Sequence, residues 1–240
     1  ARENGAQVIV VDPAVSGRTR QDVVAEILRL EPDWVGIVSY EYRREVPLTH
    51  SKTFAQELRE QGVKAPIGML SCPVGDLECR KLVEKRDLDF LVFGDAECVV
   101  QAFAQGKGFI GKGILANTDQ GMVEEEPVEK LDWSILVPPA WDLMDWGHYI
   151  PSAHRYRKLP VFPVMASRSC PFGCDFCPQS LFQPSDVYSS RPVADIISEI
   201  VHLQEEYSAQ FIEFYDPTFG VNREEALELI KAIRALKTPI

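Results

Sequence analysis

Apolar residues recur along the first half of the chain in short runs that alternate with amphipathic stretches. The short runs are typical of buried strands, and they lie at Gln7–Val11, Trp34–Ser39, Ala65–Leu70 and Asp89–Phe93. Apolar residues at helical spacing indicate helices at Thr19–Leu30, Thr49–Gln61, Asp76–Arg86 and Ala96–Gln105. Phe109–Leu115 and Gly121–Glu124 suggest a small hairpin across Asn117–Gln120. Repeated strand–helix units of this kind predict a parallel sheet with helices on both faces.

The loops after these strands are the candidate ligand-binding rim, because open parallel sheets bind ligands at the carboxyl ends of their strands. They span residues 12–17, 39–46, 70–75 and 94–97. The alternative, that these loops are simply turns, remains open at this point. No P-loop is present, so nucleotide phosphate binding of that kind is not supported.

The second half has a different pattern. Residues 125–158 lack a sustained period and hold Trp133, Trp141 and Trp146, and we expect such an aromatic connector to pack against other residues. The pattern then predicts, in order, a strand, a helix, a strand, a helix and the start of a further strand: Leu159–Ser167, Pro192–Tyr207, Gln210–Tyr215, Asn222–Leu236 and Lys237–Ile240. The expected divisions are a domain at 1–124, a connector at 125–158 and a second domain from 159 to 240.

Charge and composition restrict the classes of partner. The chain has 25 Lys and Arg residues against 36 Asp and Glu residues, a net charge of −11, which disfavours binding to nucleic acid or to an anionic membrane. No apolar run approaches the roughly 20 residues that a membrane span needs. Six cysteines are unevenly spaced, which is unlike a secreted disulfide framework and indicates a reducing, cytoplasmic environment.

Three of the cysteines form a compact cluster with the spacing C-x3-C-x2-C. Cys170, Cys174 and Cys177 follow a predicted strand, and Gly173 permits a tight bend, so their thiolates could converge on one inorganic centre. A structural zinc site would need a fourth ligand, and none has the usual spacing. Zinc and a chance cluster remain the alternatives. Cys72 and Cys79 are better explained as small buried hydrophobic residues, with a redox role for the pair as the alternative.

The cluster, with Phe176 before its last cysteine, resembles the signature of radical S-adenosylmethionine (SAM) enzymes. Arg168–Pro171 also resembles the usual approach to the first cysteine of that signature. The resemblance implies that Cys170, Cys174 and Cys177 bind a [4Fe–4S] cluster whose open iron chelates SAM. It further implies that SAM is cleaved to methionine and a 5′-deoxyadenosyl radical, with Phe176 against the adenine.

Two further residues gain roles from the same resemblance. Asp216 ends the second predicted strand of this half, where family members commonly place a polar or acidic motif that holds the SAM amino group; the alternative is a turn or helix-capping aspartate. Arg191 resembles an arginine often found before the first helix, with a surface role as the alternative. Glu213 alternates with Phe214 along its strand, and the sequence leaves both faces open for it.

The whole order of segments resembles the cobalamin-binding subgroup of radical SAM proteins. The residues that carry it are Phe93–Glu97 and Pro139–Leu143, which lie between a Rossmann-like domain and the cysteines. The resemblance implies cobalamin contacts from the strand ends, at Ser39, Tyr40, Gly68, Gly94 and Glu97. No D-x-H-x-x-G sequence is present, so no histidine ligand to cobalt is predicted from that motif. Gly68–Ser71 also departs from the pattern often found after the third strand of such domains.

The fold class expected is therefore α/β, a Rossmann-like parallel-sheet domain followed by the first βα units of a partial TIM-type (β/α)6 radical SAM barrel. We expect a fragment that lacks both ends of a longer protein. The expected function is cobalamin-dependent methyl transfer to an unknown substrate, with a reductase or flavodoxin-type electron donor. The alternatives are cobalamin-independent rearrangement, cyclisation or oxidation by a radical SAM enzyme with a degenerate first domain, and a non-catalytic metal-binding module.

Overall fold

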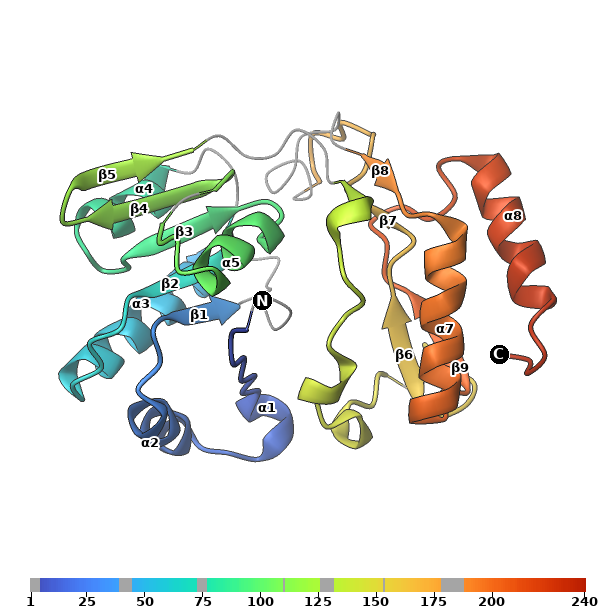
Figure 1. Cartoon of the computed structure of the whole chain (residues 1–240), viewed down its shortest axis with the longest axis horizontal. Coiled ribbons are helices and arrows are strands. Elements are labelled where there is room, and N and C mark those ends of the chain that lie inside the picture. The colour runs from blue at the N-terminus through green and yellow to red at the C-terminus, as the bar shows by residue number, and fades with distance from the viewer. Residues whose placement is uncertain are drawn as a thin grey trace. The chain divides into compact units, whose positions relative to one another are not determined.

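The chain folds into two compact units (Figure 1). The computed structural model describes residues 5–38, 45–72, 77–109, 111–125, 132–152, 154–177 and 188–240. The first unit comprises residues 1–129 with 180–183, and the second comprises 130–179 with 184–240. Each unit is built around its own cluster of buried apolar side chains. The connector predicted from the sequence lies mostly in the second unit.

The first unit contains a sheet whose strands follow one another in chain order. These are β1 (Val35–Val38), β2 (Ile67–Cys72), β3 (Phe90–Phe93), β4 (Ile114–Thr118) and β5 (Gly121–Glu124). The pairs β1–β2 and β2–β3 are parallel, whereas β3–β4 and β4–β5 are antiparallel. The predicted α/β class is confirmed, and the predicted hairpin forms with its first strand shifted to Ile114–Thr118.

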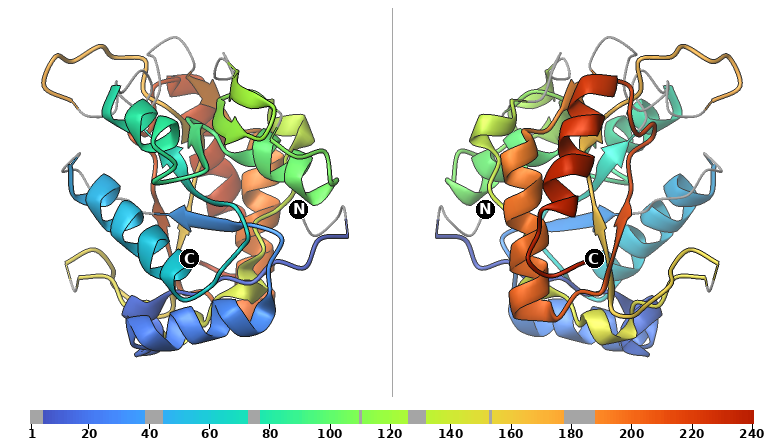
Figure 2. Two further views of the ribbon diagram at one scale, coloured as in Figure 1. Left: turned by 90° about the vertical axis from the view of Figure 1, so that its left-hand side faces the viewer. Right: turned by 90° about the vertical axis from the view of Figure 1, so that its right-hand side faces the viewer.

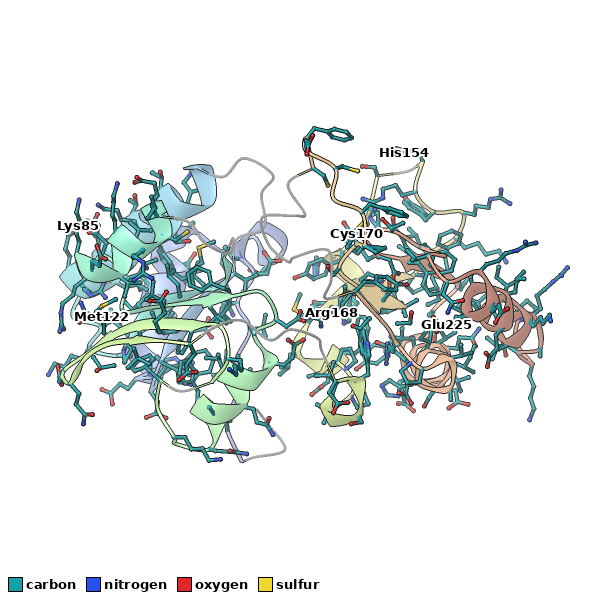
Figure 3. The ribbon with its side chains drawn as sticks, turned by 90° about the horizontal axis from the view of Figure 1, so that it is seen from above. Lys85, Met122, His154, Arg168, Cys170 and Glu225 are labelled. Carbon is teal, nitrogen blue, oxygen red and sulfur yellow. The ribbon has the colours of Figure 1, made fainter. Side chains whose placement is uncertain are left out.

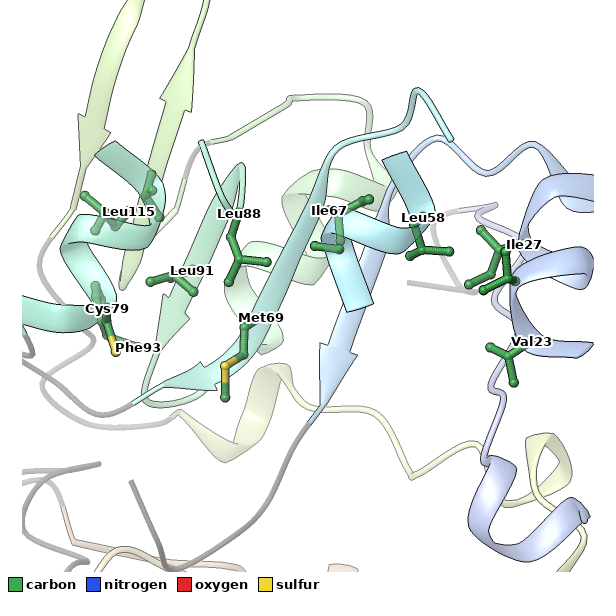
Figure 4. Close-up of a cluster of buried hydrophobic side chains, with 13 residues drawn as sticks. Val23, Ile27, Leu58, Ile67, Met69, Cys79, Leu88, Leu91, Phe93 and Leu115 are labelled. Atoms are coloured by element: carbon green, nitrogen blue, oxygen red, sulfur yellow. The ribbon is translucent and has the colours of Figure 1, made fainter. Parts of the chain in front are cut away.

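Helices cover both faces of this sheet. They are α2 (Arg20–Leu30), α3 (Glu45–Glu60), α4 (Leu77–Glu84) and α5 (Glu97–Ala104), and the short α1 (Pro13–Ser16) precedes them in the chain. On one face, Leu91 of β3 joins Leu58 of α3 and Cys79 of α4 in a buried cluster (Figure 4). On the other face, Phe90 and Val92 pack with Val99 of α5. Successive residues of β3 thus point to opposite faces, which explains why the whole strand is apolar.

The first predicted strand, Gln7–Val11, does not form. Residues 6–12 have no regular secondary structure, and Ile9 and Val10 are each 44% exposed. Their apolar run resembles a buried strand, but a strand also needs a hydrogen-bonded neighbour, and among the described residues β1 is the last strand at its side of the sheet. This prediction was wrong because an apolar run in the sequence does not by itself provide a neighbouring strand to pair with.

The second unit is a βαβα arrangement. The parallel pair β6 (Val161–Val164) and β9 (Phe211–Phe214) is connected through α7 (Val193–Tyr207), and α8 (Arg223–Arg234) follows β9. Figure 2 shows α7 and α8 side by side, as does Figure 1. A second, antiparallel ladder joins β7 (Ser167–Arg168) to β8 (Ser189–Ser190). The predicted strand at Lys237–Ile240 is not formed.

The aromatic connector forms three short 3-10 helices within the second unit. These are η2 (Trp133–Ile135), η3 (Trp141–Leu143) and η4 (Trp146–His148). Trp141 is buried against Trp146 and Phe162, with ring centroids 4.8 and 5.8 Å away, which confirms that the connector packs down. Among the helices described in either unit, none combines the length and the apolar character that a bilayer crossing requires.

Candidate functional site

The three clustered cysteines lie on one loop that leaves the short strand β7. We call residues 169–177 the cysteine loop; Figure 3 labels Arg168 and Cys170 at its start. Ser169 has a φ of 65°, and this left-handed residue turns the chain out of β7. The backbone N–H of Cys177 donates a hydrogen bond of 3.0 Å to the carbonyl of Cys174. The C-x2-C pair therefore already forms a tight turn.

The thiols do not converge on one point in this conformation. Within the ranges that the structure describes, no three Cys, His, Asp or Glu side chains are placed to hold one metal ion. Cys170 instead has its Sγ 3.1 Å from the Thr218 hydroxyl, and Cys174 is exposed. The donor set still suits an iron–sulfur cluster, because three thiolates lie in one short loop, and a Cβ at Gly173 would meet nothing within 4 Å.

Asp216 lies two residues after the end of β9 and joins the ends of two strands. Its carboxylate accepts hydrogen bonds from the Ala166 backbone N–H, at 3.1 and 3.2 Å, and from the Ser167 hydroxyl at 2.6 Å. The capping residue of α8 is Asn222, not Asp216. Asp216 therefore fixes the segment that leads into the cysteine loop, and its predicted contact with SAM stays a prediction.

A small pocket lined by both polar and apolar residues adjoins Asp216 at the carboxyl ends of β6 and β9. Its lining includes Ser167, Tyr188, Arg191, Asn222 and Glu225. These polar side chains come from β7, from the residues on either side of β8, and from the start of α8. This is the position that the fold would use for a ligand, because the carboxyl ends of parallel strands open there.

Phe176 projects from the cysteine loop into solvent. Its side chain is 90% exposed, and Phe172 on the same loop is 58% exposed. Large apolar side chains in water are a common mark of a surface that binds something. The exposed ring of Phe176 is accessible to a ligand, and its expected contact with adenine stays a prediction.

A buried polar network lies beside the cysteine loop, and sequence reasoning found only part of it. Glu199 of α7 is 5% exposed and pairs with the Arg191 guanidinium. Its second carboxylate oxygen accepts a hydrogen bond of 3.1 Å from Trp141 Nε1. Arg191 thus has a buried partner rather than the surface role considered as an alternative. Glu199 was missed, although it stands in the apolar stripe of its helix beside Ile196 and Ile200.

Glu213 points to the face of β9 that carries Arg155. The Arg155 Nε donates to the Glu213 carboxylate at 2.7 Å, and its guanidinium lies 5.2 Å from the Tyr215 ring centroid. The hydrogen bond with the Tyr215 side chain, and then that with Glu213, raise the pKa of Arg155. Arg155 therefore stays cationic and neutralises the carboxylate.

The residues predicted to contact cobalamin are spread over the first sheet. Gly94 follows β3 with a φ of 69°, a left-handed turn that suits glycine, and Glu97 begins α5. Ser39 and Tyr40 lie outside the described residues. Gly68 lies within β2, where a Cβ would come 2.3 Å from the carbonyl oxygen of Phe90. The role visible for Gly68 is close packing between strands.

Comparisons with known proteins agree with this fold. No protein-family model matches the chain. An uncharacterized methyltransferase of Pyrococcus horikoshii is 28% identical over 233 residues, which cover 95% of this chain and 49% of the relative. The chain therefore spans about half the length of that curated relative.

Two solved structures of one protein match nearly the whole chain. They are the cobalamin-dependent S-adenosylmethionine radical enzyme OxsB without ligands and the same enzyme with aqua-cobalamin and S-adenosylmethionine bound. Each matches with a TM-score of 0.71 over 98% of this chain and 33% of OxsB, at 15% and 16% identity. At this identity the likeness shows the fold alone: the two units of this chain have the fold of the matching third of OxsB.

Proposed function

We propose that this chain is part of a radical SAM enzyme in which Cys170, Cys174 and Cys177 hold a [4Fe–4S] cluster. The observation that carries the proposal is the position of the cysteine loop, which leaves β7 beside Asp216, where β6 and β9 end. The likeness to OxsB and the relative named as a methyltransferase support it. When bound, the cluster would supply one electron and an open iron for SAM.

The chain's own residues would bind and shield the reactants. The three thiolates would hold the iron, and the loop would close from its present conformation to bring them together. Asp216 would keep the entry to the loop in place, and Phe176 would cover the adenine and exclude water by burying its exposed ring. The electron donor would be a reductase or a flavodoxin-type protein.

The proposal extends to cobalamin-dependent methyl transfer by the whole protein. OxsB binds aqua-cobalamin and SAM, and the same fold places Gly94 and Glu97 at the carboxyl end of β3. Ser39, Tyr40 and Gly68 are the further proposed contacts. The substrate that receives the methyl group is not specified by any described residue.

The test of the cluster is anaerobic reconstitution followed by metal analysis and electron paramagnetic resonance. We expect about four irons per chain and a reduced spectrum that shifts when SAM is added. Replacing Cys170, Cys174 or Cys177 by alanine should abolish both results, whereas the buried Cys79→Ala should retain them. Zinc in place of iron, or a spectrum that ignores SAM, would contradict the proposal.

Cobalamin-independent radical chemistry is the second candidate, and the packing of Gly68 favours it. A residue enclosed between strands by Phe90 has little surface to offer a corrin. Corrinoid uptake by the full-length protein, followed by its absorbance, separates the two. If 5′-deoxyadenosine forms equally fast with and without cobalamin, the methyl-transfer proposal fails and the second candidate stands.

A further inference from the structure

The cysteine loop is anchored, where it leaves β7, by very little regular structure. The ladder between β7 and β8 has two residue pairs, Ser167↔Ser190 and Arg168↔Ser189. Arg191 extends it with a backbone N–H that donates to the Ala166 carbonyl at 2.8 Å. An isolated two-stranded ladder is marginal in water, so other interactions must hold these ends together.

Arg191 and Trp133 supply such interactions from outside the ladder. The Arg191 guanidinium donates a hydrogen bond of 3.4 Å to the carbonyl oxygen of Met165, which lies two residues before β7. Trp133 Nε1 donates to the Ser189 hydroxyl at 3.2 Å. The guanidinium carbons of Arg168 and Arg191 lie 5.8 and 6.0 Å from the Trp133 ring centroid. Both strands of the β7–β8 ladder thus contact one tryptophan and one arginine.

Glu199 is what keeps Arg191 in this position. The side chains of Arg191 and Glu199 are 12% and 3% exposed, so each charge is buried and needs the other. Trp141 donates to the remaining Glu199 oxygen, and its own carbonyl accepts from Trp146 Nε1 at 2.7 Å. The network therefore continues from the β7–β8 ladder into the aromatic connector.

We propose that Trp133, Trp141, Arg191 and Glu199 form a tether that fixes the start of the cysteine loop, where it leaves β7, against β8. Arg191 and Glu199 are then positioning residues for the three thiolates, although neither touches them. On this proposal, the aromatic connector helps to position the metal ligands and is more than a spacer between the two domains. The consequence for metal binding rests on the proposed function, whereas the tether itself is testable without any metal.

The first measurement is backbone hydrogen exchange on the reduced, metal-free chain. Glu199→Gln keeps the shape of the side chain but leaves Arg191 buried without its counter-charge. We expect exchange at residues 166–168 and 189–191 to become about tenfold faster or more, because local opening of the ladder becomes easier. Leu203→Ala, a fully buried change on the same helix, is the control for general loss of stability. Equal exchange of the ladder amides in the two variants would overturn the proposal.

The second measurement is Co²⁺ binding by the thiols, followed by the thiolate-to-metal absorption bands under anaerobic conditions. We expect Glu199→Gln to weaken Co²⁺ binding by about 10- to 100-fold, the usual effect of losing a group that orients metal ligands. Arg191→Lys should retain part of the affinity, since it keeps the charge but loses the forked geometry. Unchanged affinity in Glu199→Gln would overturn the link to the thiols.

A double variant separates positioning from stability. Arg191→Met combined with Glu199→Leu removes both buried charges, and such replacements often restore stability. We expect the double variant to unfold like the parent chain and still to show fast ladder exchange and weak Co²⁺ binding. Recovery of both readouts together with stability would mean that the network is structural only. If the parent chain binds no Co²⁺, the proposed function fails, and the exchange measurement alone decides the tether.

Discussion

In the centre of the first sheet, Gly68 of β2 lies between Gly36 of β1 and Phe90 of β3. A Cβ on Gly68 would come 2.3 Å from the Phe90 carbonyl oxygen and 2.5 Å from the Phe90 ring. A Cβ on Gly36 would meet only the side chains of Leu70 and Trp34, at 3.0 Å. The backbone oxygen cannot move without shifting β3, whereas side chains can turn away. An added methyl group should therefore destabilise the fold more at Gly68 than at Gly36.

We expect Gly68→Ala to lower the free energy of unfolding by about 3 kcal/mol and Gly36→Ala by about 1 kcal/mol. The difference follows from overpacking against fixed backbone in the first case and against adjustable side chains in the second. Urea denaturation of both variants measures it. Equal losses would show that β3 can shift to make room, contrary to the packing described here.

The same scale shows what the sequence could tell about the site and what it could not. The spacing of Cys170, Cys174 and Cys177 identified the loop, because ligand chemistry is local in the chain. Glu199 could have been found from its place in the apolar stripe of α7, where it stands three residues after Ile196 and one before Ile200. Its partner Trp141 lies 58 residues away and could not, because no pattern in the sequence pairs them.

Among the elements, α2 shows how a local signal can define a helix end. The Thr19 side chain accepts a hydrogen bond from the Asp22 N–H, and the Asp22 carboxylate accepts one from the Thr19 N–H. The Thr19 hydroxyl, followed by its backbone N–H, lowers the pKa of Asp22. Because that pKa is lower in the folded chain, the contribution of Asp22 to stability is present above its unfolded pKa and is lost as the pH falls through the folded value.

We expect Thr19→Ala to reduce stability by about 1 kcal/mol at neutral pH, whereas Thr19→Ser should cost much less because it keeps the hydroxyl. Without its hydroxyl partner, the Asp22 pKa should rise toward the ordinary value. The loss caused by Thr19→Ala should therefore shrink in acid, below the usual range of aspartate pKa values. Urea unfolding at neutral and acid pH tests this, and a loss that is the same at both would refute the coupling.

Elements that depend on distant partners were predicted less well than those with local signals. Helices α2, α5, α7 and α8 were found nearly to the residue from spacing and caps. The run at Gln7–Val11 was taken for a strand, although Ile9 and Val10 are half-exposed, because an apolar run says nothing about which neighbour completes its hydrogen bonds. The antiparallel direction of β4 relative to β3 was equally unreadable, since strand direction is decided between segments.

At the scale of the molecule, the two units have separate cores. Leu58 and Met69 belong to the first core and Ile200 and Leu203 to the second, and the two buried clusters have no residue in common. Separate cores permit separate cooperative unfolding, so a single two-state description need not hold for the chain.

We expect scanning calorimetry to resolve two transitions, one for each unit. Leu58→Ala should shift only the transition of the first unit, and Leu203→Ala only that of the second. Each should lower the free energy of unfolding of its own unit by about 2–5 kcal/mol, because both leucines are fully buried. The double variant should show the sum of the two effects. If either single variant lowers both transitions equally, the two cores unfold as one cooperative body.

The exposed phenylalanines of the cysteine loop have a thermodynamic consequence of their own. Phe176 and Phe172 leave apolar area in water that any ligand seated on the loop would cover. Covering apolar area gives binding a negative heat-capacity change, whatever the enthalpy is at one temperature. Titration calorimetry at several temperatures would therefore report whether a ligand has reached this loop, and Phe176→Ala would make the temperature slope shallower for such a ligand alone.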